Sequence, residues 1–313
     1  MHFPPSRPLT AGTDFPWLGP GPAPAVHFHP ARARAGPSAT RPVLLIHGFR
    51  GDHHGLGLMA HELRAHDVYV PDLPGFGRTP PPPDGLSLDA YTAHIAALAE
   101  ALAQDTGQAP LLVGHSFGSI LAAHTFAAHP RISPGLGLLS PIVTPALEGS
   151  ARFLTGLTRL YYAAGSRLPE RAGAALLSHP LIVRAMSEVM ATTRDRRLRA
   201  YIHDQHAQHF SDYADRDSLA QAYEISIRHT VAEAAPGLAE AARPVLLVAG
   251  DADLIAPIAD TRAFADSLRA ASLTVTVEEL HGVGHLLHYE RAAETAEAIS
   301  AFARRLPAEP SGG

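Results

Sequence analysis

Short apolar runs alternate with amphipathic stretches along most of the chain. Gly, Pro or Asp bounds the apolar runs, which is typical of strands that are buried on both faces of a parallel sheet. These runs cover residues 43–46, 68–70, 111–113, 136–139, 245–248 and 273–277. Stretches with a helical period lie between most of them, at residues 88–103, 119–128, 260–270 and 291–305. This alternation predicts an α/β fold, a mostly parallel sheet with helices on both faces.

Two segments interrupt the alternation. Residues 1–40 are rich in Pro, which cannot donate ladder hydrogen bonds, so we expect an irregular arm with one short strand at 25–28. Residues 143–236 have a helical composition and contain no convincing strand. We therefore expect a core formed by 41–142 and 237–313, and a helical insertion at 143–236. Because ligands bind at the ends of parallel strands, we expect this insertion to form a lid.

A glycine-flanked serine follows one of the predicted strands. The motif GHSFG, residues 114–118, comes directly after the apolar run at 111–113 and opens the helical run at 119–128. Two glycines let the chain turn sharply from strand to helix, and the turn presents Ser116 at the strand end. A Gly-rich turn alone is a weak signal, but this strand–turn–helix context favours Ser116 as a nucleophile.

The motif HGFRG, residues 47–51, follows the predicted strand at 43–46. A turn at a strand end can aim a backbone N–H at the nucleophile. We expect the N–H groups of Phe49 and Phe117 to form an oxyanion hole, which stabilises a tetrahedral intermediate. We expect His47 to brace this loop rather than to act in catalysis.

Two aspartates compete for one role in the motif GDADLIAP, residues 250–257. A carboxylate at a strand end can reach a histidine on a neighbouring strand end and orient it. Asp253 is the better candidate because it lies beyond the strand and its turn. Asp251 is expected to make local hydrogen bonds to the backbone.

The motif HGVGH, residues 281–285, lies between the last predicted strand and the last predicted helix. Its glycines allow a loop that presents a histidine inwards. His281 and His288 are alternatives, but His285 is favoured because it stands between the glycine turn and an apolar pair. Histidine, with a reference pKa of about 6.5, can accept and return the proton of a serine near neutral pH.

The serine, aspartate and histidine follow one another in the chain order of the α/β-hydrolases. The sequence resembles that superfamily in the motifs HGFRG, DLPGFGRT, GHSFGS, GDADLIAP and HGVGH, which run from about residue 41 to the last predicted helix. The resemblance implies an eight-stranded, mostly parallel sheet with a helical cap. The segment at 72–77 resembles a structural turn of the family, without a catalytic role.

The predicted function is that of a serine hydrolase that cleaves a carboxylic ester of small or medium size. Ser116 attacks, His285 acts as the base, Asp253 orients His285, and an acyl-enzyme forms, so no cofactor is required. The same triad could instead serve C–C bond hydrolysis, thioester hydrolysis or a perhydrolase (haloperoxidase-like) reaction. A non-catalytic binding protein is a third possibility, although candidates for every catalytic role are present.

Further side chains are candidates for substrate contact or for metal binding. His53 and His54 follow the oxyanion loop and are expected at the mouth of the site or exposed. The aromatic residues of the insertion that could contact substrate are Phe153, Tyr161, Tyr162, Phe210 and Tyr213, with Phe153, Tyr161 and Phe210 as the first candidates, although aromatics at helical spacing more often form cores. The chain has 20 histidines, and His203, His206 and His209 are spaced by three residues. No H-E-x-x-H motif occurs, so we expect no bound metal and a solvated or pocket-lining helix there.

The amino-acid composition excludes several kinds of partner and of chemistry. The net charge of −5 offers no basic excess for phosphates, which argues against nucleic acid as a partner. The absence of Cys excludes disulfides and thiolate chemistry. No apolar run spans a membrane, and the Pro-rich N-terminus does not resemble a signal peptide. We expect a cytoplasmic monomer or homodimer that acts on a small molecule.

Overall fold

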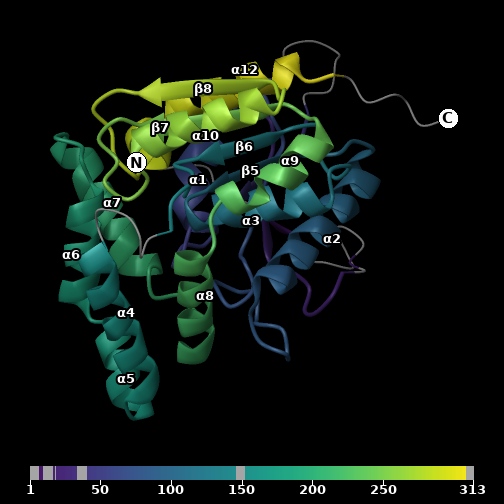
Figure 1. Ribbon diagram of the computed structural model, residues 1–313. Helices are drawn as coiled ribbons and strands as arrows, with labels where there is room; N and C mark the ends of the chain where they lie inside the picture. The colour runs from purple at the N-terminus through teal and green to yellow at the C-terminus, as the bar shows by residue number, and fades with distance from the viewer. Residues whose placement is uncertain (1–6, 10–16, 18, 34–40, 146–151, 308–313) are drawn as a thin grey trace.

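A single mixed sheet with helices on both of its faces forms the centre of the molecule (Figure 1). The computed structural model describes residues 7–9, 17, 19–33, 41–145 and 152–307, and side chains in all of these except 152–157. Its eight strands lie in the order β1-β2-β4-β3-β5-β6-β7-β8. The strands are β1 (Arg7–Leu9), β2 (Val26–His29), β3 (Val43–Ile46), β4 (Val68–Pro71), β5 (Leu111–His115), β6 (Leu136–Leu139), β7 (Val245–Gly250) and β8 (Val275–Leu280). The predicted α/β class and the eight-stranded, mostly parallel sheet are confirmed.

The strands from β3 to β8 run parallel, whereas β1 and β2 add an antiparallel edge beside β4. The prediction of a single strand in the N-terminal arm was therefore wrong. The strand β2 lies close to its expected position, but β1 was missed because three residues carry too little pattern. Pro8 is tolerated in β1 because an edge strand has one side free of ladder hydrogen bonds.

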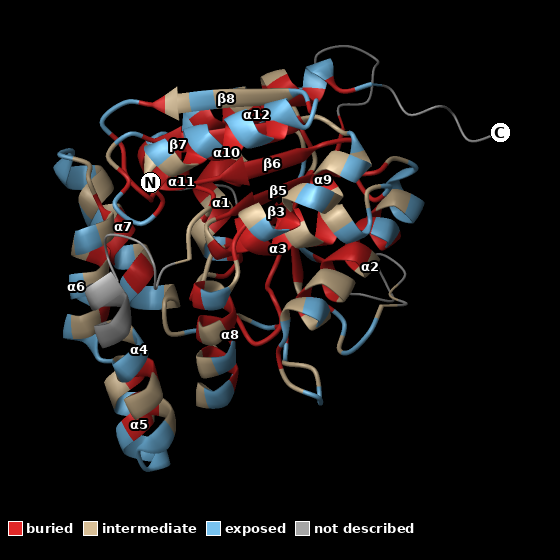
Figure 2. Cartoon of the chain, viewed as in Figure 1, coloured by how far each residue is buried: buried red, intermediate tan, exposed pale blue. Residues whose placement is uncertain are grey.

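Alternate residues of the parallel strands pack on opposite faces of the sheet. In β3, Leu44 and Ile46 belong to an apolar cluster that contains residues of α2 (Leu88–Thr106) and α3 (Phe117–Ala128). Val43 and Leu45 belong to a second cluster with α1 (His53–Glu62) and α12 (Ala292–Arg305). The central strands are almost wholly buried (Figure 2), which explains their continuous apolar sequence.

A group of helices separates β6 from β7 in the sequence. These helices are α4 (Arg152–Arg167), α5 (Glu170–Leu177), α6 (Pro180–Met190), α7 (Arg196–His209) and α8 (Arg216–Arg228). In Figure 1, α4 to α7 extend away from the sheet on the side where the strands β5 to β7 end. The chain then returns through η1 (Ala232–Ala234) and α9 (Ala235–Ala241), and α9 packs against α3. We call residues 152–228 the helical insertion.

Two further helices complete the core, α10 (Ile258–Ala270) after β7 and α11 (Leu287–Glu290) after β8. The strand β8 begins two residues later than the apolar run at 273–277 suggested, and it is only partly buried because it forms the second edge of the sheet. None of the helices in the described ranges combines the length and the apolar character needed to cross a membrane.

Candidate active site

Ser116 stands at the turn between β5 and α3, in a conformation that few residues other than glycine adopt. Its φ is 55° and its ψ is −120°, a sparsely populated region whose occupation costs about 1–3 kcal/mol. The flanking glycines make this turn possible. A Cβ on Gly114 would lie 2.1 Å from the Gly118 carbonyl oxygen, and a Cβ on Gly118 would lie 2.3 Å from the Ile46 carbonyl oxygen. The turn therefore requires both glycines and presents the serine at the end of β5.

Two hydrogen bonds connect Ser116 to a histidine and then to an aspartate. The Ser116 Oγ lies 2.7 Å from the His285 Nε2, and the His285 Nδ1 lies 2.9 Å from the Asp253 Oδ2. The other oxygen of Asp253 accepts hydrogen bonds from the N–H groups of Ile255 (2.8 Å) and Ala256 (2.9 Å). A neutral imidazole can donate from Nδ1 to the carboxylate and accept at Nε2 from the serine hydroxyl.

Two of the alternative residues, Asp251 and His281, pair with each other instead. The His281 Nδ1 lies 3.0 Å from the Asp251 Oδ2, and the Gly282 N–H donates to the Asp251 Oδ1 at 2.7 Å. The side chain of His281 is 85% exposed, whereas that of His285 is 6% exposed. The Asp251–His281 pair thus fastens the loop of residues 281–285, which we call the histidine loop, to the end of β7 at the surface.

Ionised Asp253 is favoured by its neighbours. Burial alone would raise the pKa of the Asp253 carboxyl, but His285 and two backbone N–H groups hold that pKa below its usual value.

Two other imidazoles lie beside His285. Burial lowers the pKa of His115 to about 3 and that of His288 well below the usual value. Both rings are therefore neutral at pH 7, and the His115 ring lies against the His285 backbone with Nε2 3.0 Å from the His285 carbonyl oxygen.

The loop of residues 47–51 lies directly against the serine. A Cβ on Gly48 would approach the Ser116 Cβ to 3.3 Å. His47 braces this loop, because its Nδ1 lies 2.8 Å from the Gly48 carbonyl oxygen and its Nε2 accepts the Leu73 N–H at 2.9 Å. Phe117 is the first residue of α3, where backbone N–H groups have no partner within the helix. The loop and the helix start therefore meet beside Ser116.

The insertion touches both the loop of residues 47–51, the predicted oxyanion loop, and the histidine loop, through contacts that the sequence motifs did not reveal. Arg50 of the oxyanion loop is 2% exposed and bonds to several segments of the insertion. On the other side, the Gly284 N–H donates to Thr192 Oγ1 at 3.0 Å. Thr192 in turn bonds to the buried carboxylate of Glu290 through its N–H at 2.6 Å and through its hydroxyl. The only sequence signal for the first contact was an arginine between Phe49 and Gly51, in a loop that joins a buried strand to a helix.

Those predicted substrate contacts whose side chains the structure describes have partners within the protein. His53 bonds to Asp72, and His54 bonds to Asp52, with distances of 2.8 and 2.9 Å from each Nδ1 to the carboxylate. The Tyr161 hydroxyl donates to carbonyl groups at the end of α5, the nearer at 3.0 Å. Phe210 stacks on the ring of His206, at 4.2 Å between centroids. The side chain of Phe153 lies outside the described residues.

The histidines of α7 do not converge on a common point. The Nδ1 atoms of His203 and His206 share the Ser187 hydroxyl, at 2.6 and 2.7 Å. His209 stacks instead on His54. His203 and His206 thus connect α6 to α7, whereas His209 packs on α1 and places its Nδ1 3.3 Å from an Asp212 carboxylate oxygen and 3.8 Å from one of Asp52.

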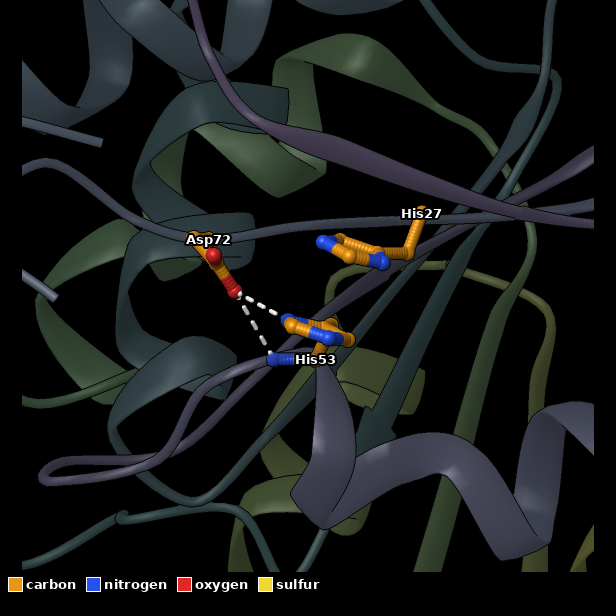
Figure 3. Close-up of side chains that lie close together, drawn as sticks. All are labelled: His27, His53 and Asp72. Carbon is orange, nitrogen blue, oxygen red and sulfur yellow. Dashed lines mark hydrogen bonds and ion pairs between the residues drawn. The ribbon is translucent and has the colours of Figure 1, made fainter. Parts of the chain in front are cut away.

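A second cluster, His27, His53 and Asp72, brings possible ligand atoms within 4.8 Å of one another (Figure 3). The rings of His27 and His53 lie parallel, 3.1 Å apart with an interplanar angle of 5°. A metal ion binds in the plane of an imidazole, so two stacked rings cannot share one ion in this arrangement. Asp72 accepts the ring and backbone N–H groups of His53, and also the Arg78 N–H at 2.9 Å. The cluster is a hydrogen-bonded brace that holds the turn at residues 72–77.

The family of the chain follows from its comparison with known proteins. The alpha/beta hydrolase family matches residues 43–298, and the chain belongs to this family. Lipase LipV of Mycobacterium tuberculosis is 41% identical over 118 residues, which are 37% of this chain and 42% of the lipase. The chain thus aligns with less than half the length of that relative.

Solved structures resemble the whole fold at low identity. A thermophilic esterase from Thermogutta terrifontis superposes with a TM-score of 0.70 and 21% identity, over 93% of this chain and 99% of the esterase. A bromoperoxidase from Bacillus anthracis superposes with a TM-score of 0.66 and 18% identity, over 90% of this chain and 96% of that protein. At these identities the similarity shows the fold alone. The reaction must be inferred from the residues of the site.

Proposed function

We propose that the protein hydrolyses a carboxylic ester of small or medium size, with Ser116 as the nucleophile. The observation that carries this proposal is the continuous hydrogen-bond chain from Ser116 through His285 to the buried Asp253. A serine hydroxyl is a weak nucleophile at neutral pH, and an adjacent base that is itself oriented by a carboxylate activates it.

The proposed reaction has two halves. The Ser116 Oγ attacks the ester carbonyl carbon while its proton moves to the His285 Nε2, and the N–H groups of Phe49 and Phe117 stabilise the resulting oxyanion. The intermediate then collapses, and the leaving alkoxide takes the proton from His285, so that an alcohol departs and an acyl-enzyme remains. In the second half, His285 removes a proton from water, the hydroxide attacks the acyl carbon, and the acid is released as Ser116 regains its proton.

We further propose that residues 143–236 act as a lid that selects substrates by size. The helices of this segment bond to the loops on both sides of Ser116, through Arg50 and Thr192. Tyr162 and Tyr223 of the insertion lie beside Phe49, with ring centroids 5.5 and 5.7 Å away. A segment attached in this way limits the space that an acyl or alcohol group can occupy.

A panel of acyl esters of graded chain length tests the ester hydrolase proposal, with Ser116→Ala as the blank. We expect turnover of at least the short esters, and covalent labelling of Ser116 by a fluorophosphonate. Labelling without ester turnover would direct attention to C–C, thioester or perhydrolase chemistry on the same triad. If neither labelling nor turnover occurs, a non-catalytic binding role becomes the better hypothesis.

The pH dependence of kcat/KM is expected to have a single acid limb centred at about pH 6–7, the range in which histidines titrate. The base must be neutral to accept the serine proton, so activity falls as the pH drops through this range. Asp253, with its lowered pKa, stays ionised there, and His115, with a pKa of about 3, stays neutral. An acid limb centred below about pH 5 would indicate a carboxylate base and contradict the mechanism.

Exhaustive chelation is expected to leave ester hydrolysis unchanged. Each step of the proposed reaction uses only side chains and backbone N–H groups of this chain, and two of the three histidines of α7, His203 and His206, already share a serine hydroxyl. Activity is measured before and after dialysis against a chelator, and again after addition of zinc or manganese. A loss that either metal restores would mean that a histidine cluster binds a metal.

A further inference from the structure

Arg50 is a buried cation whose partners are helix ends rather than acidic side chains. The residue is 2% exposed, and among the described residues no carboxylate forms an ion pair with it. The Nε donates to the Phe210 carbonyl and the Nη2 donates to the Leu177 carbonyl, each at 2.9 Å. Leu177 is the last residue of α5, and Phe210 caps the end of α7. The negative ends of these two helices therefore compensate the charge.

A third helix, α4, and the segment that follows α7 contribute aromatic rings to the same environment. The Arg50 Nη1 lies 3.3 Å from the Tyr162 hydroxyl oxygen of α4, where the tyrosine can accept a hydrogen bond. The rings of Tyr162, Phe210 and Tyr213 lie with their centroids 5.8–5.9 Å from the guanidinium carbon, within the range of cation–π attraction. One side chain thus holds parts of α4, α5 and α7 together.

The backbone of Arg50 belongs to the loop that lies against Ser116. Its φ is +61°, which is uncommon for a residue with a side chain, and the Gly51 N–H donates to the Gly48 carbonyl at 3.1 Å to close the turn. Such a conformation persists when the surroundings determine it. At Arg50, the surroundings that determine the conformation are the helix ends of the insertion. The preceding residue is Phe49, whose backbone N–H is the proposed oxyanion donor.

We propose that Arg50 is a positioning residue, which couples the docked insertion to the alignment of the Phe49 N–H beside Ser116. This inference rests on the proposed function. When the three segments are docked, the guanidinium holds the loop in its turn conformation. When they separate, the anchor is lost and the oxyanion hole loosens. Closure of the insertion would thereby complete the oxyanion hole at the same time as it encloses the substrate.

The test compares Arg50→Met with Arg216→Met. Arg216 is a matched control, because its Nη1 also bonds to carbonyl groups of the insertion, those of Gly165 (2.9 Å) and Leu168 (2.7 Å). Within the part of the chain that the structure describes, no hydrogen bond of Arg216 reaches residues 47–51. For an acetyl ester, Arg50→Met is expected to lower kcat about 30–100-fold and to keep KM within about threefold of the parent. A misaligned N–H donor gives up part of the transition-state stabilisation that would be lost completely if the donor were removed. Arg216→Met is expected to keep kcat within about twofold of the parent, whatever its effect on Tm.

Two readouts separate alignment of the hole from general stability. The first is the ratio of kcat/KM for an oxoester to that for the matching thionoester, because an aligned hole favours oxygen over sulfur. The second is the rate at which a fluorophosphonate labels Ser116, because its phosphoryl oxygen also occupies the hole. Arg50→Met is expected to lower both quantities, and Arg216→Met to change neither. Labelling needs no ester turnover, so it tests Arg50 even if the ester hydrolase proposal fails.

If both variants lower kcat equally, or if Arg50→Met leaves the oxoester ratio and the labelling rate unchanged, the coupling proposal is overturned. Arg50→Lys keeps the charge but carries all its donors on one nitrogen, which cannot reach the three acceptors that Nε, Nη1 and Nη2 of arginine reach separately. It is therefore expected to restore only part of the loss. Should Arg50→Met fail to fold, Tyr162→Phe removes one bond of the network and keeps the ring. It is expected to lower the oxoester ratio and the labelling rate in the same direction by a smaller factor. Unchanged values in Tyr162→Phe would overturn the proposal as well.

Discussion

Ser116→Ala and His285→Ala are each expected to lower kcat for an ester about 10⁴–10⁶-fold, and the double variant is expected to lose little more. The two side chains act as a unit, because the serine is nucleophilic only when the imidazole takes its proton. Removing either one therefore disables the other. The background rate that remains comes from substrate binding and from the N–H groups around the oxyanion.

The measurement is kcat for a short ester, with the residual rate corrected for trace contamination. His281→Ala is the matched control, because His281 lies in the same loop but its side chain is exposed and pairs with Asp251. Its activity is expected to stay within about twofold of the parent. Equal losses of activity in His281→Ala and His285→Ala would show that activity depends on the intact loop and not on His285 as the base. Full activity in Ser116→Ala would remove the serine mechanism.

The parallel strands and the order of the candidate residues could be predicted because both leave local patterns. Continuous apolar runs such as 111–113 and 245–248 mark strands that are buried on two faces. The GHSFG turn could be predicted because any residue larger than glycine would clash at residues 114 and 118. A Cβ on Gly118, for example, would overlap the Ile46 carbonyl. The eight-stranded topology came from the family resemblance rather than from these patterns.

Contacts between distant segments could not be predicted in the same way. Nothing in the sequence around Arg50 indicates that it bonds to Leu177 and Phe210, which lie 127 and 160 residues away in the chain. The strand β1 was missed because it has three residues and includes a proline. Thr192, which bonds to the loop before His285, lies in a polar stretch without a motif. Each of these features depends on how the insertion or the arm folds back on the core.

Asp253→Asn is expected to lower kcat about 10³–10⁴-fold, somewhat less than loss of the serine or the histidine. Asparagine keeps an oxygen that can accept the N–H groups of Ile255 and Ala256, so the loop is retained. Its NH₂ group, however, faces the His285 Nδ1 and requires a lone pair there. The imidazole proton then moves to Nε2, which can no longer accept the proton of Ser116. The variant is also expected to lose the charge that stabilises the imidazolium.

Asp251→Asn is the matched control for this change, because Asp251 stands two residues earlier at the same strand end. Its carboxylate accepts the Gly282 N–H and pairs with the exposed His281, and an asparagine oxygen can still accept the N–H. Activity in Asp251→Asn is expected to stay within about threefold of the parent, since surface pairs contribute little. Both variants are compared by kcat on the same short ester, with Tm as the measure of folding. Full activity in Asp253→Asn together with loss in Asp251→Asn would reverse the two assignments. The hydrogen bond between Asp253 and His285 would then be structural, and the surface pair would have to reach the serine by a rearrangement of the histidine loop.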